Sequence, residues 1–329
     1  MEKKIIALAE QNFPDLTDRS PETISWMNVN FLERFIKAPL RRPVYGIYNL
    51  LTTAWLAKKY QPITTFEVNT WLWGQRGNDY SSHRRRVDRI LPIQNKKILI
   101  AGCGTGRDVV SWLRYSPMEL VGLDYFNYGK AWSTVSCTME KQYPKTLLSF
   151  QQGNLNNLST FKEGEFDIVG SDAVFEHLKD PLTVCREWYR ILKPGGILYA
   201  TFGPLWYGWH GDHFSGWDFI ETGFNHLELC PEDYQDYLDQ QPFSEHSEEN
   251  GRTWIENGLF SYLKPAQYLE VLAASGLKRR HVGIIMEPRA LECFDRRPDL
   301  KNKLTEQHSL MDLLICGMTV IFQKPKAAV

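Results

Sequence analysis

The feature that most constrains the fold is a glycine-rich stretch between a short apolar run and a segment with helical character. KILIA (97–101) is the apolar run, AGCGTGRD (101–108) is the glycine-rich stretch, and an apolar segment beginning DVVSW follows. In open parallel sheets, a glycine-rich turn at a strand's carboxyl end that opens a helix is where nucleotide-like ligands bind. Glycines let the backbone approach a ligand closely, and the exposed N–H groups of the turn can donate to it.

From residue 93 onward, short apolar runs alternate with helical segments, which predicts a parallel sheet with crossover helices. Helices are expected from Pro181 to the KPGG stretch (193–196), which ends the helix, and from Pro265 to Gly276. The predicted strands, about seven, are the apolar runs at 97–101, 119–123, 147–151, 166–170, 196–202, 281–286 and 316–324.

Residues 1–92 lack strand-like alternation and are expected to be helical, forming an N-terminal cap or substrate region. Residues 93–329 are expected to form the core domain, with an insert at 203–261. The last N-terminal helix is predicted around HRRRVDR (83–89), and we interpret its basic residues as a solvated helix face.

Composition narrows the class of protein. Hydrophobic residues make up 43% of the chain, charged residues 23%, and the formal net charge is -1. These values fit a soluble globular protein and give no broad basic surface for nucleic acid. The six cysteines show no CxxC pairing, and the longest apolar stretch (44–57) is too short to span a membrane. The sequence therefore predicts a cytoplasmic protein with reduced thiols.

The spacing of the glycines separates the ligand classes. A dinucleotide site needs G-x-G-x-x-G, but here Arg107 follows Gly106 directly, which disfavours a nicotinamide dehydrogenase. No Gly-Lys-Ser/Thr follows either, so a P-loop is excluded. Asp124 ends the second predicted strand, eighteen residues after Gly106. A carboxylate at that position can accept hydrogen bonds from both hydroxyls of a ribose.

The stretches ILIAGCGTGRD, VGLDYF, FDIVGSDAVFEHLKDP and ILKPGGILYATF resemble, in order and spacing, the class I S-adenosylmethionine-dependent methyltransferases. The resemblance is specific over about 90–202 and weaker over 262–324, and it leaves out the N-terminal helices and the insert. It implies a Rossmann-like, doubly wound α/β sheet of seven strands. The last strand would be antiparallel and lie between the fifth and sixth.

The resemblance also implies residues that hold S-adenosyl-L-methionine. Asn154 stands where the family usually has aspartate, and its alternative role as a turn residue stays open, as does a helix N-cap role for Asp172. The implied cofactor residues are Gly102, Cys103, Gly104 and Gly106 at the methionyl part, Asp124 at the ribose, Tyr125, Asn154 and Leu155 at the adenine, and Ser171 and Asp172 near the methyl group.

Two segments after the fourth and fifth strands are candidates for the acceptor side. In FEHL (175–178), Glu176 and His177 match the end of a cation motif of some relatives, but Ala173 replaces its first carboxylate. No metal is expected there, since hard cations want several oxygen ligands, and His177 is expected to pack against the sheet.

The insert begins with WYGWHGDH (206–213) and is too long for a plain connection. We expect it to hold the methyl acceptor, with His210 or His213, beside Asp212, as a general base. Structural histidines and a His-x-x-His metal site are the alternatives, and no metal is expected.

The preferred hypothesis is a methyltransferase acting on a small molecule, with a hydroxyl oxygen favoured over nitrogen and a ring-bearing acceptor favoured by the aromatic residues. N-methylation and a catalytically silent binding module are the alternatives, and a homodimer is left open. A nucleic-acid methyltransferase is disfavoured because SDAV (171–174) stands where such enzymes carry Asn/Asp-Pro-Pro-Tyr.

Overall fold

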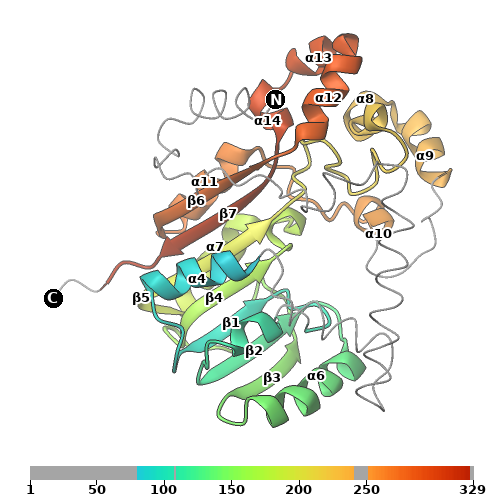
Figure 1. The fold of residues 1–329 in the computed structure, drawn as a ribbon. Coiled ribbons are helices and arrows are strands. Elements are labelled where there is room, and N and C mark those ends of the chain that lie inside the picture. Colours follow the sequence, from blue (N-terminus) through green and yellow to red (C-terminus); the bar gives the residue numbers. More distant parts are fainter. Residues whose placement is uncertain (1–79, 107–108, 241–250, 327–329) are drawn as a thin grey trace. The chain divides into compact units, whose positions relative to one another are not determined.

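A seven-stranded sheet with strand order β3-β2-β1-β4-β5-β7-β6 organises the chain (Figure 1). This is the Rossmann-like α/β fold that the sequence predicts, with the last strand between the fifth and sixth. The computed structural model describes residues 80–106, 109–240 and 251–326. Most of the predicted N-terminal cap therefore lies outside the described residues, and its role stays a prediction.

The described residues fall into two compact units. The first contains residues up to Asp172, together with 190–199 and the segment from Lys324. The second contains 173–189 and 200–323. None of the described helices is long and apolar enough to cross a membrane.

The first unit holds four parallel strands: β1 (Lys97–Ala101), β2 (Glu119–Asp124), β3 (Leu147–Gln152) and β4 (Phe166–Asp172). β1 lies between β2 and β4, and its residues from Ile98 to Ala101 are fully buried. An uninterrupted apolar run is what a strand covered on both faces requires. β3, at the edge of the sheet, instead alternates exposed and half-buried residues.

The same unit contains three described helices: α4 (Tyr80–Ile90), α5 (Val109–Leu113) and α6 (Gly129–Gln142). α4 confirms the helix predicted around the basic run. α6 packs against β3 and buries one face, which includes Trp132 and Met139.

The junction between α7 (Pro181–Ile191) and β5 (Leu192–Phe202) differs from the prediction. The KPGG stretch was expected to end the helix and turn, but it belongs to the strand. The reason is backbone pairing: Gly195 N–H donates to the Lys324 carbonyl (3.0 Å), and Lys324 N–H donates to the Gly196 carbonyl (3.0 Å). Gly195 has a φ of +81°, a backbone conformation that glycine adopts easily and that residues with a Cβ rarely adopt.

The second unit contains the insert and the end of the sheet. β6 (Lys278–Met286) pairs antiparallel with β7 (Ile315–Gln323), as the resemblance implied. Besides most of α7, the helices of this unit before β6 are η2 (Phe175–His177), η3 (Ile220–Thr222), α8 (Asn225–Glu228), α9 (Pro231–Asp239), α10 (Gly251–Glu256) and α11 (Pro265–Ala274).

Three further helices lie between β6 and β7, where the sequence reading placed none: α12 (Pro288–Arg296), α13 (Pro298–Thr305) and α14 (Leu310–Leu314). Their start signals are present in the sequence. Proline stands at the first position of α12 and α13, and Ser309 forms a capping box with Asp312.

The interpretation of the basic run as a solvated face is wrong for Arg84, which is fully buried. Its guanidinium donates to both carboxylate oxygens of Asp172 (3.1 and 2.5 Å) and, through Nε, to Ser111 Oγ (3.0 Å). The guanidinium also lies over the rings of Trp112 (4.6 Å) and Tyr199 (5.0 Å). Arg85 and Arg89, in contrast, are exposed as expected.

We predict that Arg84→Met lowers the free energy of unfolding by about 3–5 kcal/mol, because it leaves the Asp172 carboxylate buried without its cation. Denaturant titration measures this loss. Arg85→Ala, one residue away and exposed, should stay within about 0.5 kcal/mol of the parent protein. Equal stability of Arg84→Met and Arg85→Ala would contradict the role given to the ion pair.

Candidate active site

The glycine-rich loop after β1 and the aspartate that ends β2 are in direct contact. Gly102, Gly104 and Gly106 have φ values of +72°, +50° and +90°, a region that favours glycine. Gly104 N–H donates to Asp124 Oδ2 (2.8 Å), and Phe126 N–H donates to Asp124 Oδ1 (3.0 Å). The sequence predicted that the loop and this carboxylate act together, and the structure brings them together.

Two aromatic residues that the sequence analysis did not predict, Trp132 and Phe150, pack next to the loop. Trp132 Nε1–H donates to the Gly104 carbonyl (2.7 Å), and the Trp132 ring stacks on Phe150 with centroids 5.6 Å apart. Phe150 lies so close to the backbone that a Cβ at Gly122 would be 2.5 Å from its ring. The loop conformation thus depends on a glycine in β2 as well as on its own glycines.

The loop and Asp124 fit the polar groups of a nucleoside. A Cβ at Gly104 would meet no atom of the described residues within 4 Å, so none of these residues fills that side of the loop. Burial raises the pKa of Asp124 above its ordinary value, and the backbone donors at Phe126 and Gly104 do not fully offset that effect. The carboxylate can therefore gain from further donors such as ribose hydroxyls. Tyr125 next to it is 65% exposed, which leaves its ring available to an adenine.

The other predicted cofactor residues have partners within the protein. Ser171 Oγ donates to the Ala101 carbonyl (3.0 Å), and the Asp172 carboxylate accepts from Arg84 and from the Tyr199 hydroxyl (3.0 Å). A contact of Ser171 or Asp172 with the cofactor stays a prediction. Asp172 is above all the anion of a buried ion pair.

The predicted adenine segment after β3 forms a turn. Asn154 Oδ1 accepts from Asn156 N–H (2.9 Å), which is the turn role left open for this residue, while Leu155 is buried. Cys103, within the glycine loop, is also buried. The adenine contacts of Asn154 and Leu155 stay predictions.

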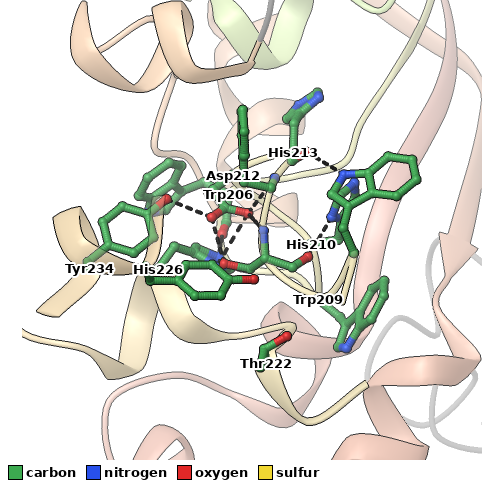
Figure 2. A network of polar contacts seen from close by, with 12 residues as sticks. Trp206, Trp209, His210, Asp212, His213, Thr222, His226 and Tyr234 are labelled. Carbon is green, nitrogen blue, oxygen red and sulfur yellow. Dashed lines mark hydrogen bonds and ion pairs between the residues drawn. The ribbon is translucent and has the colours of Figure 1, made fainter. Parts of the chain in front are cut away.

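In the second unit, Asp212 is the centre of a buried polar network (Figure 2). Its carboxylate is fully buried and accepts from the N–H groups of Phe214 (3.0 Å) and Ser215 (2.8 Å). The hydroxyls of Ser215 and Tyr234 also donate to it, both at 2.6 Å. Asp212, predicted as part of the catalytic group, thus has its lone pairs occupied by protein donors.

His210 and His213 differ in what their ring nitrogens contact. His210 Nδ1 lies 2.6 Å from the Ser215 carbonyl, whereas His213 Nε2 is buried and has no hydrogen-bond partner in the described part of the chain. Burial lowers the pKa of His210 below 6.5, and burial together with neighbouring histidines lowers that of His213 well below 6.5.

His177 belongs to the same cluster of rings as His213. Its centroid lies 5.0 Å from that of His213, 4.4 Å from Trp254 and 5.1 Å from Phe260. His177 Nδ1 lies 2.9 Å from the Leu259 carbonyl, and burial lowers the pKa of His177 to about 4. The ring contacts of His177 are thus with aromatic residues of the insert, and its packing against the sheet stays a prediction. Among the described residues, no three His, Cys, Asp or Glu side chains form a group that could hold a metal ion.

The comparisons with known proteins agree with the fold and the loop. Residues 99–200 match the family model described as a methyltransferase domain. This match agrees with the resemblance to the class I S-adenosylmethionine-dependent methyltransferases, which includes the same stretch of the chain.

Among curated proteins, the chain is similar to a ubiquinone biosynthesis O-methyltransferase of Albidiferax ferrireducens, with 26% identity over 35% of this chain and 44% of the relative. It is also similar to an arsenite methyltransferase of Aquipseudomonas alcaligenes, with 31% identity over 32% of each protein. The chain spans about half the length of the curated relatives it matches first. Among solved structures, a methyltransferase of Mesorhizobium loti has 17% identity, covers 75% of this chain and 99% of its own, and gives a TM-score of 0.47.

We predict that acid destabilises the protein through its buried histidines. Because the pKa of His177 is near 4 in the folded state and 6.5 is its ordinary value, the unfolded state binds more protons between these pH values. Stability present above pH 6.5 is therefore lost as the pH falls toward 4. Thermal melts from pH 7 to 4 should show a smaller decrease for His177→Asn, whose amide can still donate to the Leu259 carbonyl. An identical decrease in both proteins would contradict the assignment.

Proposed function

We propose that the protein transfers a methyl group from S-adenosylmethionine to the hydroxyl oxygen of a small molecule. The observation that carries the proposal is the hydrogen bond from Gly104 N–H to Asp124 at the joined ends of β1 and β2. It holds a glycine loop, whose side at Gly104 no described residue fills, beside a carboxylate whose pKa is raised because its backbone donors do not fully offset burial. The methyltransferase family match over 99–200 supports the same donor.

We assign one group of residues to binding the cofactor and another to binding the methyl acceptor. S-adenosylmethionine would supply an electrophilic methyl group on its sulfonium. Asp124 would accept from the ribose hydroxyls, Tyr125 would lie against the adenine, and Gly102, Gly104 and Gly106 would let the backbone approach the methionyl part. Such a displacement needs the acceptor aligned in line and shielded from water. We assign the binding of the acceptor to the insert.

A base is needed when the acceptor is a hydroxyl, since its proton must leave as the methyl group arrives. His210 suits this role better than His213. Its Nδ1 faces a carbonyl, which can only accept, so the proton sits on Nδ1 and Nε2 keeps its lone pair. His213 Nε2 is buried, and its lower pKa makes it the weaker base. The O-methyltransferase name of the Albidiferax relative supports oxygen as the acceptor atom.

We predict that S-adenosylhomocysteine binds the protein and that Asp124→Ala weakens this binding by about 10²-fold, the equivalent of losing charge-assisted hydrogen bonds. Isothermal calorimetry measures both constants. Asp295→Ala, an exposed aspartate of α12, is the matched control and should bind like the parent protein. No binding to the parent protein would reject the proposed cofactor. Binding without transfer to any acceptor would favour the silent module.

We predict that kcat/KM falls on the acid side with an apparent pKa below 6.5, because protonation of His210 removes the base and burial holds its pKa below that value. His210→Gln should lower kcat by about 10²–10⁴-fold and remove this acidic limb. His213→Gln should retain the limb. The rates are measured from pH 5 to 8 with an acceptor found by transfer of a labelled methyl group. Loss of the limb in His213→Gln alone would give His213 the role of base.

A further inference from the structure

The environment of Asp212 shows that it can act only through other residues. Each of its oxygens already accepts hydrogen bonds from the protein: Oδ1 from two backbone N–H groups, and Oδ2 from the hydroxyls of Ser215 and Tyr234. The side chain is completely buried, and its pKa is lowered although burial acts to raise it, since His226 and the hydroxyl donors outweigh burial. Asp212 therefore stays a carboxylate, and it has no lone pair left to take a proton from a substrate.

Ser215 connects this carboxylate to His210. Its N–H and its hydroxyl both donate to Asp212, at 2.8 and 2.6 Å, which fixes the residue at its amide end. Its carbonyl oxygen lies 2.6 Å from His210 Nδ1. In Figure 2, Asp212 lies at the centre of the network and the ring of His210 at its margin.

The chemistry of that last contact determines the tautomer of His210. A carbonyl oxygen only accepts, so Nδ1 must carry the hydrogen. In a neutral imidazole the other nitrogen is then the acceptor, and the partner of one nitrogen decides the state of the other. Within the part of the chain that the structure describes, His210 Nε2 has no hydrogen-bond partner.

A second histidine, His226, lies beside Asp212. His226 Nε2 lies 2.7 Å from the Trp206 carbonyl, so Nε2 also carries a hydrogen, and its Nδ1 faces Asp212 Oδ1 at 3.8 Å. The charged or titratable groups that act on His210 are Asp212, Arg289, His226 and His213. Among them Asp212 is the anion, and it raises the pKa of His210, whereas Arg289 and His226 lower it.

We propose that Asp212 is a positioning residue that, through Ser215, holds His210 with its hydrogen on Nδ1 and its Nε2 lone pair free to accept a proton. The consequence for catalysis rests on the proposed function, in which His210 is the base. The positioning itself is a property of the insert, and it can be measured without cofactor or acceptor.

Long-range ¹H–¹⁵N correlation spectra of the full-length protein test the positioning directly. The His210 signals are assigned by their absence in His210→Gln. In the parent protein above pH 7, Nε2 of His210 should resonate as an unprotonated nitrogen and Nδ1 as a protonated one. A protonated Nε2 in the parent protein would overturn the proposal without any variant of Asp212.

Two substitutions separate the geometric and electrostatic parts of the effect. Asp212→Ala removes every acceptor for Ser215 and should allow both tautomers of His210. Asp212→Asn keeps an oxygen for the two backbone N–H groups, so the Nδ1–H tautomer should persist. It removes the charge, so the titration of His210 should move to lower pH. If Asp212→Ala does not fold, Asp212→Asn and the parent protein still decide, because a protonated Nε2 of His210 in both above pH 7 would overturn the proposal.

Asp218→Asn is the matched control. Asp218 lies in the same insert and accepts from the hydroxyls of Thr222 and Tyr237, but it is exposed and does not contact Ser215. This variant should leave the tautomer and the titration of His210 unchanged. A shift as large as that of Asp212→Asn would show a general charge effect and overturn the specific role of Asp212.

Kinetics separate this proposal from the proposed function. Asp212→Ala should lower kcat by about 10²-fold through misplacement of the base, with little change in the affinity for S-adenosylhomocysteine. In Asp212→Asn the acidic limb of kcat/KM should move to lower pH together with the NMR titration. If the tautomer and titration respond as expected while His210→Gln keeps full activity, the positioning role of Asp212 is supported and the assignment of His210 as base fails.

Discussion

The hydrogen bond between Gly104 N–H and the Asp124 carboxylate is the interaction on which the rest of the account depends. It joins the turn after β1 to the end of β2, and so it sets the shape of the loop at the edge where parallel sheets bind their ligands. The loop is held on its other side by Trp132, which contacts the Gly104 carbonyl and stacks on Phe150. Backbone hydrogen bonds and aromatic packing thus set the shape of the loop that we propose as part of the cofactor site.

Three buried aspartates differ in how the surrounding residues compensate their charge. Asp172 is neutralised by Arg84, and Asp212 is surrounded by backbone and hydroxyl donors that keep its pKa low. Asp124 has backbone donors only, and its pKa is raised because these do not fully replace water. Among these three aspartates, Asp124 therefore has the charge that the protein's own donors stabilise least. Hydroxyl groups of a ligand would stabilise this carboxylate most.

Local patterns in the sequence predicted the sheet, the glycine loop and its pairing with Asp124. These features could be predicted because apolar runs and glycine-rich turns involve residues that are close together along the chain. The burial of Arg84 could not be predicted in this way, since its partner Asp172 lies 88 positions along the chain. The same holds for the contact of Tyr234 with Asp212 across 22 positions. The helices between β6 and β7, in contrast, could have been predicted, because the prolines at their starts and the Ser309 capping box are visible in the sequence.

The most direct test of the central claim is transfer of a labelled methyl group. The protein is incubated with methyl-labelled S-adenosylmethionine and a heat-treated cell extract that contains small metabolites, protein and nucleic acid, and the products are separated by size and chemistry. We expect the label in a small molecule, as a methyl ether. The parent protein should form this product, and Asp124→Ala, which lacks the carboxylate proposed to bind the ribose, should not. Label confined to protein or nucleic acid, or no transfer to any fraction, would contradict this expectation.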